Sequence, residues 1–502
     1  MQTCFLRKAF RIRFLLVAPV LFALACGDAD PDGAAAVESS AAALGLSTTA
    51  YEAESLTRTA SAIGSKVTSD TAASGGMYVE FNGTAASGAW IEFTLPGVAT
   101  GTYELKFLFK SNTNRGIIQA SIDGVNQGSA CNEYAASVAY KVPCSLGSKA
   151  LTAGNHQIRL TVTGKSASSS GYQLVVDQIS LTAKSVGPCD IYSAGGTPCV
   201  AAHSTVRALF GAYTGKLYQV RTAAGATKDI NTGTAGGAAN AAAQDSFCAG
   251  TTCVITVVYD QSGKGNDLWY QGAGSPVGGK DQPASATGES IKVSGNKVYS
   301  LYLNPGNSYW VDGAQRGVPL GSAPEAMYMV TSGTHYNGGC CFDYGNSEVG
   351  RNYVGASAED AVNFSNSTMW GSGAGAGPWV MADFESGICT QNNYGKNLND
   401  PTQTAPFVTA VLKNNGVTEF ALRGGDATSG SLATYFKGAL PAGVGPMKKQ
   451  GAIVLGSSGD CCLTNTSASR GTFYEGCLVS GYPSDATENA VQANIIAAGY
   501  GK

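Results

Sequence analysis

Apolar residues recur at every second position through the first part of the chain, and this alternation restricts the fold more than any other feature. Tyr103–Lys110 places Leu105, Phe107 and Phe109 on one face, and His156–Thr163 repeats the pattern. Because successive side chains of a β-strand point to opposite faces, such segments are expected to be half-buried strands. Two more of them span Trp90–Leu95 and Gln173–Leu181. Short strands at this spacing predict a β-sandwich (jelly-roll) module over residues 49–184.

A second, larger domain is expected over residues 187–502. Val254–Tyr259 is a further strand segment, and the 66 glycines supply the positive-φ positions that many tight turns need. Only two helices are predicted, a short one over Ser204–Ala212 and a C-terminal one that Asp485 caps with Glu488 three residues later. The whole chain is therefore expected to be all-β.

The N-terminus has the composition of an export signal. Basic residues precede an apolar run from Phe14 to Ala25, which is too short to span a bilayer as a mature helix. Ala23–Gly27 resembles a bacterial lipobox and implies a signal peptide over residues 1–25 with a lipid anchor on Cys26. Ordinary secretion with cleavage nearby is the alternative. Residues 26–48, rich in Ala, Ser and Gly, are expected to form a flexible tether.

Cysteine and charge content narrow the function. Of 14 cysteines, Cys4 and Cys26 belong to the export segment, and the remaining 12 predict disulfides, with Cys131 and Cys144 able to close one loop. No Cys/His cluster has zinc spacing, and a formal net charge of −3 offers no field for nucleic acid. P-loop, serine-elbow and HExxH motifs are missing from the sequence. Carboxylate chemistry on a neutral polysaccharide remains, without a cofactor for catalysis.

Two segments carry candidate acids. On an extended strand, Trp379–Glu385 would project Trp379, Met381, Asp383 and Glu385 to the same side. A strand end with both acids in solvent is the alternative. In Leu455–Cys462 an apolar strand leads into a glycine-rich loop with Asp460 at its tip, although most such acids only form turns.

From Gly187 onward the chain resembles the catalytic domain of the glycoside hydrolase family 54 α-L-arabinofuranosidases. The matching runs, in order, are Thr197–Thr205, Ala243–Cys248, Tyr259–Gly263, Gly333–Tyr336, Cys340–Asn346, Trp370–Gly371, Gly377–Trp379 and Gly471–Gly476. The resemblance implies a concanavalin-like β-sandwich and a retaining mechanism that releases terminal arabinofuranosyl units from arabinan and arabinoxylan of the plant cell wall.

The resemblance also implies roles for individual residues. Glu385 matches the nucleophile and Asp460 the general acid/base, which retention places about 5–5.5 Å apart. Burial and the Glu385 charge are then expected to raise the pKa of Asp460. The substrate-binding positions that match are Asp383, Trp370 as one wall of the sugar pocket, Gly459 through its backbone, and the vicinal disulfide Cys340–Cys341 as an apolar floor. Separate bridges or free thiols are the alternative for Cys340 and Cys341. By the same resemblance Cys189 pairs with Cys199 and Cys248 with Cys253.

The chain departs from this family pattern in three respects. Ser386-Gly387 follows the nucleophile where the family has two asparagines, the first a sugar contact. Four additional cysteines, Cys389, Cys461, Cys462 and Cys477, permit three pairings, of which a bridge from Cys389 to Cys461 or Cys462 would tie the two catalytic loops. Fungal members usually end in an arabinose-binding β-trefoil, which is not expected here because the catalytic match reaches the last residues.

The first domain resembles carbohydrate-binding modules of families 6 and 35 through Tyr51–Ser55 and Val176–Leu181. In those modules the matching acids bind a structural Ca²⁺, so the resemblance implies Glu52, Glu54 and Asp177 as ligands; a sandwich without metal is the alternative. Tyr78 and Trp90 are candidate sugar-stacking aromatics, although core packing explains Trp90 equally well.

The sequence thus favours an exported, monomeric, exo-acting arabinofuranosidase that uses Glu385 and Asp460. Two other functions stay open, a non-catalytic polysaccharide-binding lectin and a glycosidase that acts on β-xylosides. The replacement of a sugar contact by Ser386 motivates the first of these.

Overall fold

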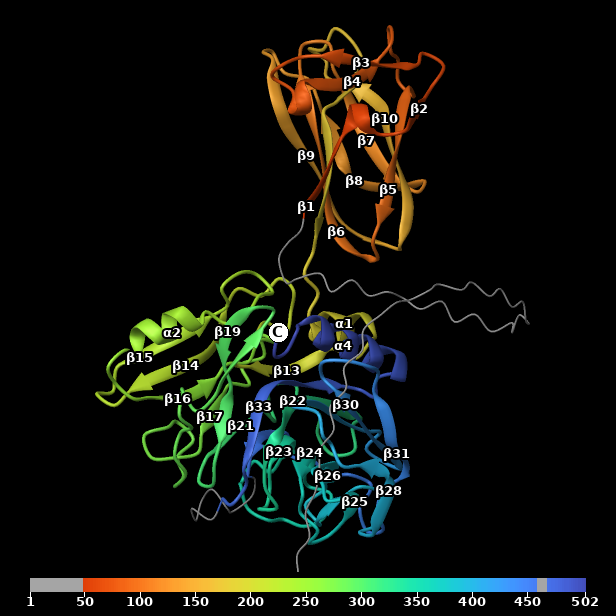
Figure 1. Ribbon diagram of the computed structural model, residues 1–502. Coiled ribbons are helices and arrows are strands. Elements are labelled where there is room, and N and C mark those ends of the chain that lie inside the picture. The colour runs from red at the N-terminus through yellow and green to blue at the C-terminus, as the bar shows by residue number, and fades with distance from the viewer. Residues whose placement is uncertain (1–47, 458–466) are drawn as a thin grey trace, which may run out of the picture. The chain divides into compact units, whose positions relative to one another are not determined.

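A computed structural model describes residues 48–457 and 467–502, and strands make up most of it (Figure 1). The all-β prediction is confirmed. Buried apolar side chains form two large separate clusters, one from residues 53–181 and the other from residues 189–500. The signal peptide, the tether, Cys26 and residues 458–466 lie outside the described residues.

The N-terminal part is a β-sandwich around the first cluster. Its four-stranded sheet has the order β1 (Thr48–Glu52), β12 (Gln178–Ala183), β6 (Gly101–Ser111), β9 (Ala139–Leu151). The five-stranded sheet has the order β2 (Arg58–Ala60), β5 (Trp90–Val98), β10 (Gly154–Lys165), β7 (Gly116–Ile122), β8 (Val125–Asn132). A small sheet joins β11 (Val175–Val176), β4 (Met77–Phe81) and β3 (Ser65–Ser69), and two 3-10 turns are η1 (Ala53–Ser55) and η2 (Ser74–Gly76).

The alternation that predicted these strands is explained by burial. Leu105, Phe107 and Phe109 of β6 are all buried in the first cluster, whereas the residues between them are more exposed. The segment predicted as one strand, Gln173–Leu181, is instead divided at Asp177 into β11 and β12, which belong to different sheets. Asp177 is the residue at which the chain passes between them.

The C-terminal part contains two large sheets. The seven-stranded sheet consists of β13 (Cys199–Ser204), β33 (Gly471–Ser480), β22 (Glu325–Tyr336), β29 (Phe407–Asn414), β30 (Glu419–Asp426) and β31 (Ala433–Ala439), with β20 (Leu301–Leu303) paired to β33. The ten-stranded sheet has the order β15 (Thr227–Asn231), β14 (Lys216–Thr222), β16 (Cys253–Val258), β17 (Leu268–Tyr270), β21 (Ser308–Asp312), β32 (Ala452–Gly456), β23 (Asp343–Ser347), β24 (Asp360–Ser365), β26 (Trp379–Asp383), β27 (Ile388–Cys389). The C-terminal part also contains two separate two-stranded sheets. One pairs β18 (Ser290–Val293) with β19 (Asn296–Tyr299), and the other pairs β25 (Ser372–Ala374) with β28 (Lys396–Pro401).

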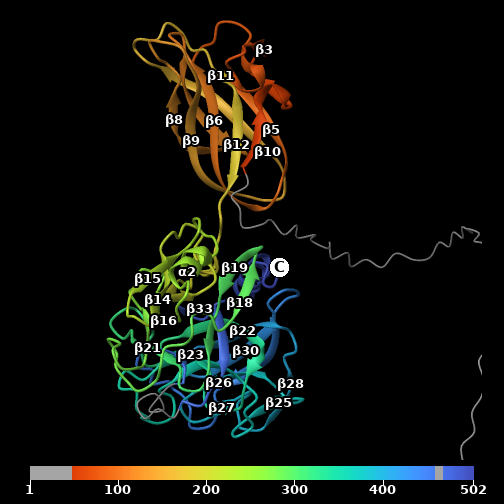
Figure 2. The ribbon, with the colours of Figure 1, turned by 60° about the vertical axis from the view of Figure 1, so that its left-hand side comes forward.

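These two sheets form a sandwich with the second cluster between them. The ten-stranded sheet contributes Val362, Phe364, Val380 and Ala382 to this core, and β22 and β29 contribute residues from the other side. Neighbouring residues of β26 alternate, so that Trp379 and Met381 lie in a different, smaller cluster on the outer face of the same sheet. β26 and β27 run beside β25 and β28 at this end of the sandwich (Figure 2).

The described residues include three α-helices, α1 (Pro188–Ala194), α2 (Ala241–Phe247) and α4 (Asp485–Ala497). The predicted helix over Ser204–Ala212 is wrong, because Ser204 ends β13 and the following residues form turns. The C-terminal helix is present, with Val491, Ile495 and Ala498 buried in the core. Its N-cap is Ser484 rather than Asp485, since the Ser484 hydroxyl accepts a hydrogen bond from Thr487 N at 3.1 Å.

Glu488 of α4 does not complete a capping box. It is buried and binds Lys413 Nζ at 3.0 Å and the guanidinium of Arg423 on the seven-stranded sheet. The sequence pattern assigns Glu488 to the helix end. Its carboxylate instead pairs with the buried cations Lys413 and Arg423, which would otherwise lack a counter-charge.

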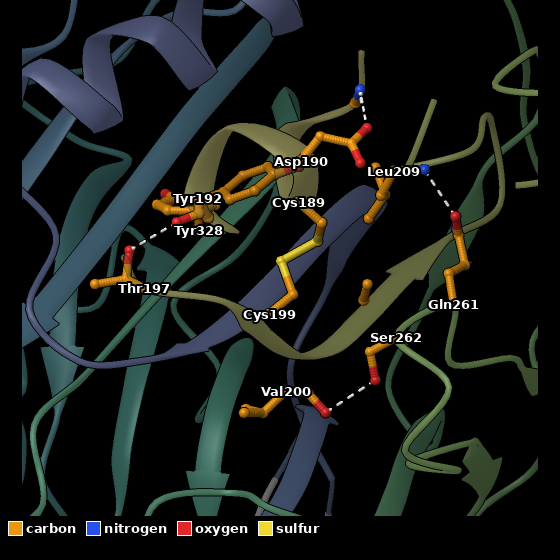
Figure 3. Close-up of a disulfide and its surroundings, with 12 residues drawn as sticks. Cys189, Asp190, Tyr192, Thr197, Cys199, Val200, Leu209, Gln261, Ser262 and Tyr328 are labelled. Carbon is orange, nitrogen blue, oxygen red and sulfur yellow. Dashed lines mark hydrogen bonds between the residues drawn. A yellow bond between two sulfur atoms is a disulfide. The ribbon is translucent and has the colours of Figure 1, made fainter. Parts of the chain in front are cut away.

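A disulfide ties α1 to β13 at the start of the second sandwich (Figure 3). Cys189 and Cys199 form this bond, and Thr197 Oγ1 donates to Tyr192 O at 3.4 Å in the intervening turn. On the other side of β13, Ser262 Oγ donates to Val200 O at 3.1 Å. The segment is therefore anchored by covalent and hydrogen bonds together.

The other disulfides of the described residues are Cys131–Cys144, Cys248–Cys253 and Cys340–Cys341. The three pairs in the second sandwich are those that the family resemblance implies. Bridges of this number are typical of exported proteins, in agreement with the expected export. Among the described helices, none has the length and apolar character required to cross a membrane.

Candidate active site

Strand order brings several acids to one edge of the ten-stranded sheet. The end of β23, the start of β24 and the end of β26 are adjacent, because Asn346 pairs with Asp360 and Ala361 with Asp383. Glu348 follows β23 directly, Glu359 precedes β24, and Glu385 lies two residues beyond β26. Residues distant in sequence therefore converge on this edge.

The acids lie on the outer face of the sheet, away from the core between the sheets. Asp383 is on the same face as Met381 and Trp379, whereas Val380, Ala382 and Phe384 are part of the core. The neighbouring positions on this face are small. A Cβ on Gly345 would lie 2.5 Å from Asp360 O and 2.8 Å from the Ala361 side chain, so only glycine fits there.

Glu385 stands outside the strand that the sequence predicts for it. β26 ends at Asp383, and Glu385 has a φ of 59°, in the left-handed region that non-glycine residues seldom occupy. The Asp383 carboxylate accepts a hydrogen bond from Glu385 N at 3.0 Å and holds this turn. Asp383 is buried and Glu385 is half-buried, so the alternative of two solvated acids at a strand end is wrong. A residue held in such a backbone conformation is a common feature of functional sites.

Burial and mutual repulsion raise the pKa values of these acids. The pKa of Glu385 rises to about 8, mainly through burial and then through the neighbouring Glu348, while a hydrogen bond with Glu359 lowers it. The pKa of Asp383 rises to about 6, again through burial and through Glu348, against the hydrogen bond from Glu385 N. The pKa of Glu359 and that of Asp343 lie well above the usual range because both side chains are completely buried. Groups with such shifts in one place are typical of active sites.

An apolar pocket wall adjoins Glu385. Cys340 and Cys341, joined as a vicinal disulfide, pack with Trp370, Trp379 and Met381 in one cluster. Trp370 and Cys340 are only partly buried, so both present surface at the site. Apolar and aromatic side chains of this kind suit the carbon face of a sugar ring.

Gly387 is in contact with this wall. Its φ is 116°, and an added Cβ would lie 2.6 Å from Trp370 Cδ1. Ser386, the residue before it, shares a 2.7 Å hydrogen bond with the hydroxyl of Tyr394. The Ser386-Gly387 departure from the family pattern therefore has a structural consequence, because glycine lets Trp370 lie directly against the Glu385 turn.

Asp460 and Gly459 lie outside the described residues, but the strand before them reaches the site. β32 ends at Gly456, and Ser457 Oγ donates to Cys340 O at 3.4 Å. The last described residue before the loop is thus hydrogen-bonded to the vicinal disulfide. Ser467, the first described residue after the loop, donates through its hydroxyl to Ser457 Oγ at 2.8 Å. Both ends of the Asp460 loop are consequently fixed beside Cys340.

The hypothesis of a bridge from Cys389 to Cys461 or Cys462 is wrong, because Cys389 is a free thiol buried in the core. The physical reason is strand alternation in β27. Ile388 packs in the site cluster with Trp379, and Cys389, the next residue, points to the opposite face. Cys477 on β33 is likewise a free buried thiol, whereas Cys461 and Cys462 lie outside the described residues.

Sequence reasoning missed Asp343, Glu348 and Glu359. Asp343 occurs within a run that matches the family, but no spacing rule links it to Glu385. The available signal is the position of Glu348 directly after β23 and of Glu359 directly before β24, which is also where ordinary turn residues occur. Only the strand order shows that they face Glu385.

In the N-terminal sandwich, the three acids expected to bind calcium converge on η2. Asp177 Oδ1 accepts from Ser74 N at 2.8 Å, and Glu52 Oε1 accepts from Ser74 Oγ at 2.9 Å. A Cβ on Gly75 would lie 2.9 Å from Glu54 Oε1. Among the residues that the structure describes, no donor reaches the buried oxygens Glu52 Oε2 and Glu54 Oε2. Orphaned carboxylate oxygens around one small cradle fit a hard cation such as Ca²⁺.

The candidate stacking aromatics of this sandwich are less open than expected. Tyr78 is only 6% exposed, and Lys110 Nζ lies 5.1 Å from its ring centre. The Arg159 guanidinium covers one face of Trp90 at 4.1 Å from the ring centre. A sugar ring therefore cannot stack on the face of Tyr78 that Lys110 covers or on the face of Trp90 that Arg159 covers.

The family model described as "Alpha-L-arabinofuranosidase B, catalytic" matches residues 188–501. A probable alpha-L-arabinofuranosidase B of Aspergillus terreus is 53% identical over 326 residues, which cover 64% of this chain and 63% of that relative. An arabinofuranosidase/B-xylosidase of Trichoderma koningii is 53% identical over 321 residues, which cover 62% of this chain and 63% of the relative.

A solved arabinofuranosidase complexed with arabinofuranosyl-alpha-1,2-xylobiose aligns with a TM-score of 0.59 and 49% identity, over 63% of this chain and 66% of that one. The chain spans about 63% of the length of the first of these curated relatives. The family model covers nearly all of the second sandwich, including Glu385 and the vicinal disulfide. The chain therefore belongs to the alpha-L-arabinofuranosidase B catalytic family, that is, glycoside hydrolase family 54.

Proposed function

We propose that this protein is a retaining, exo-acting α-L-arabinofuranosidase that removes terminal arabinofuranosyl units from arabinan and arabinoxylan. The observation that carries the proposal is the position of Glu385, half-buried at the end of β26 beside Trp370 and the vicinal disulfide. The related structure that binds arabinofuranosyl-xylobiose supports the substrate class.

In the proposed reaction, the Glu385 carboxylate attacks the anomeric carbon of the arabinofuranosyl unit. The bond from that carbon to the leaving oxygen breaks, and Asp460 gives its proton to this oxygen. Asp460 then removes a proton from water, which attacks the same carbon and releases Glu385 as a carboxylate. Asp383 and Ser386 are proposed to hydrogen-bond the sugar, and Gly459 to contact it through its backbone.

The proposed function is tested by the configuration of the first product. Proton NMR of a fresh reaction on an aryl α-L-arabinofuranoside should show α-arabinofuranose before mutarotation begins. Arabinan and branched arabinoxylan oligosaccharides should release arabinose alone from their ends. A β-configured first product, or internal cleavage of arabinan, would contradict the proposal.

A second activity has one specific observation in its favour. The Trichoderma koningii relative is described as an arabinofuranosidase/B-xylosidase. Parallel assays on aryl β-D-xylosides measure the ratio of the two activities in this protein. A non-catalytic lectin would bind arabinofuranosides and yield no product in either assay.

We expect Gly387→Ala to raise KM for arabinofuranosides about tenfold or more, because the new methyl group would force Trp370 away from the sugar pocket. The matched control is Gly430→Ala, where φ is also positive at 75° but nothing lies within 4 Å of the added Cβ. Steady-state kinetics of both variants separate the contact with Trp370 from backbone strain. Equal effects of the two substitutions would show that Trp370 plays no part in binding.

We further propose that the N-terminal sandwich is a carbohydrate-binding module that holds Ca²⁺ through Glu52, Glu54 and Asp177. A bound cation would offset the repulsion that these carboxylates exert on one another. The burial of Asp177 and the charges of Glu52 and Glu54 raise the pKa of Asp177 to about 6. The ion would have a structural role in this module and none in hydrolysis.

Chelation is the test of this site. Removal of calcium with EGTA should lower the Tm of the N-terminal transition by about 5 °C or more, and added Ca²⁺ should restore it. Differential scanning calorimetry of Glu54→Gln should give a low Tm that no longer responds to calcium. A wild-type Tm that is unchanged by EGTA would contradict calcium binding.

Export through a lipid anchor on Cys26 also remains a proposal. Its support is the lipobox-like sequence Ala23–Gly27, and Cys26 lies outside the described residues. Plant cell-wall polysaccharide would then be the partner at the cell surface. A Cys26→Ser variant that still partitions into detergent would contradict the anchor.

A further inference from the structure

Three glutamates meet at the proposed nucleophile. Carboxylate oxygens of Glu348, Glu359 and Glu385 all lie within 4.8 Å of one another. Glu348 and Glu359 are completely buried, and the strand order of β23, β24 and β26 holds them at the same sheet edge. The family's proposed reaction uses only Glu385 of these three, so the other two buried acids need a separate explanation.

The surroundings of Glu348 offer it little neutralisation. Its Oε2 accepts a hydrogen bond from Ser347 Oγ at 3.2 Å. Its Oε1 is buried, and among the described residues no amide or hydroxyl donor reaches it. Glu348 Oε1 therefore faces the neighbouring carboxyl groups, and electrostatic repulsion between Glu348 and Glu385 acts at short range.

Three carboxyl groups at this separation, two of them completely buried, cannot all be ionised, so the cluster must retain protons. The hydrogen bond from Glu359 lowers the pKa of Glu385, as expected if Glu359 is the protonated partner and donates. The pKa of Glu359 itself lies well above the usual range, through burial and through Asp383, Asp343 and Glu385. Glu348 acts in the opposite sense and raises the pKa of Glu385.

We propose that Glu348 and Glu359 are positioning residues with opposed effects on Glu385: Glu359 donates a hydrogen bond that favours the Glu385 carboxylate, and the Glu348 carboxyl group, crowded against Glu385, disfavours it. The inference rests on the proposed function, because it assigns how the nucleophile of that function is kept reactive. A carboxylate that Glu348 destabilises gains more on forming the neutral glycosyl ester. Glu359 at the same time keeps enough of Glu385 ionised to react.

Other titratable groups face the same cluster. Asp343 on β23 and Asp383 on β26 act on it through their charges, and Asn363 Nδ2 donates to Asp343 Oδ1 at 2.7 Å. Burial raises the pKa values of Cys389 and Tyr394, and the charge of the nearby Asp383 raises them further. Since all of these remain in the variants below, changes in the pH profile report on Glu348 and Glu359.

The experiment is the pH dependence of kcat/KM, measured with EDTA present so that no cation occupies the three carboxylates. The acidic limb reports the ionisation of the nucleophile in the free enzyme. Glu348→Gln removes a like charge and should move this limb to lower pH by about one unit. Glu359→Leu removes the donor and should move it to higher pH by about one unit. Glu359→Gln keeps an N–H donor and should move it by less than about half a unit.

Glu419→Gln is the matched control, because Glu419 lies at the start of β30 on the other sheet and binds Tyr482 and Lys437. Its profile should equal that of the wild type. Shifts of Glu348→Gln and Glu359→Leu in the same direction, or no shift in either, would overturn the inference. A wild-type protein without arabinofuranosidase activity would instead overturn the proposed function.

A measurement on the unsubstituted protein covers the case in which these variants do not fold. Carbon-13 NMR of the protein labelled at the glutamate carboxyl carbon follows each group through a pH titration. We expect the Glu385 resonance, identified by its absence from the Glu385→Gln spectrum, to titrate well above the usual glutamate range. If this resonance titrates in the ordinary range near about 4.3, the three carboxyl groups do not share protons and the inference fails.

Discussion

Glu385→Gln is expected to lower kcat on an aryl α-L-arabinofuranoside by about a thousandfold or more while the protein remains folded. The amide cannot attack the anomeric carbon, so no glycosyl-enzyme forms. The substitution also removes one of three crowded carboxyl groups, and Tm should therefore stay equal or rise. Steady-state kinetics and calorimetry of the same preparation give both quantities.

Rescue distinguishes a lost nucleophile from a damaged pocket. Glu385→Gly leaves space for azide, which can attack the anomeric carbon in place of the carboxylate and should restore turnover as arabinofuranosyl azide. Glu419→Gln, the control on the seven-stranded sheet, should keep full activity. Near wild-type hydrolysis by Glu385→Gln would reject Glu385 as the nucleophile, and rescue of an equivalent Asp383→Gly variant alone would transfer the role to Asp383.

Asp460→Ala is expected to have the second largest effect, and its size should depend on the leaving group. Release of arabinose from arabinan should fall by about 10³-fold, because the alkoxide of a sugar cannot leave without a proton. An activated dinitrophenyl arabinofuranoside needs no such proton, so formation of its glycosyl-enzyme should be nearly unaffected. The alkaline limb of the pH profile should disappear with the acid group.

The control for Asp460 is an acid that only forms a turn. Asp312 at the end of β21 is exposed and accepts from Ala314 N at 3.0 Å, so Asp312→Asn should leave both substrates unaffected. Pre-steady-state measurements separate the two chemical steps for each leaving group. An equal loss by Asp460→Ala on both leaving groups would indicate a structural turn residue rather than the general acid.

Periodicity was sufficient to predict the strands but not the catalytic turn. The alternation in Tyr103–Lys110 and in Trp379–Asp383 matches the buried and outer faces of β6 and β26. Strand alternation predicts the correct side of the sheet for Glu385, but it does so by extending the strand too far. Glu385 has a φ of 59°, which lies in the left-handed region rather than the extended one. Backbone conformation at such a turn depends on tertiary contacts, here the hydrogen bond to Asp383, which no pattern encodes.

The errors at Cys389 and Ser204–Ala212 have related causes. The pairing of Cys389 was inferred from its proximity to Glu385 in sequence, whereas strand alternation sends its side chain into the core. The segment after Ser204 has helical spacing of apolar residues, yet it forms turns. Its buried Arg207 binds Glu475 on β33, the strand next to β13 in the same sheet. Long-range partners such as Glu475 decide these cases, and a single sequence does not identify them.

Covalent labelling tests the central assignment most directly. A cyclic sulfate with the configuration of α-L-arabinofuranose, the kind of inhibitor soaked into a related structure, presents an electrophilic anomeric carbon to the nucleophile. The carboxylate should open its ring and retain the whole molecule as one ester, so intact-protein mass should increase by one inhibitor. Trypsin should then give a labelled peptide from Asn352 to Lys396, and fragment ions distinguish Asp383 from Glu385 within it. We predict a single adduct on Glu385; an adduct on Asp383, or inactivation without any adduct, would contradict the mechanism.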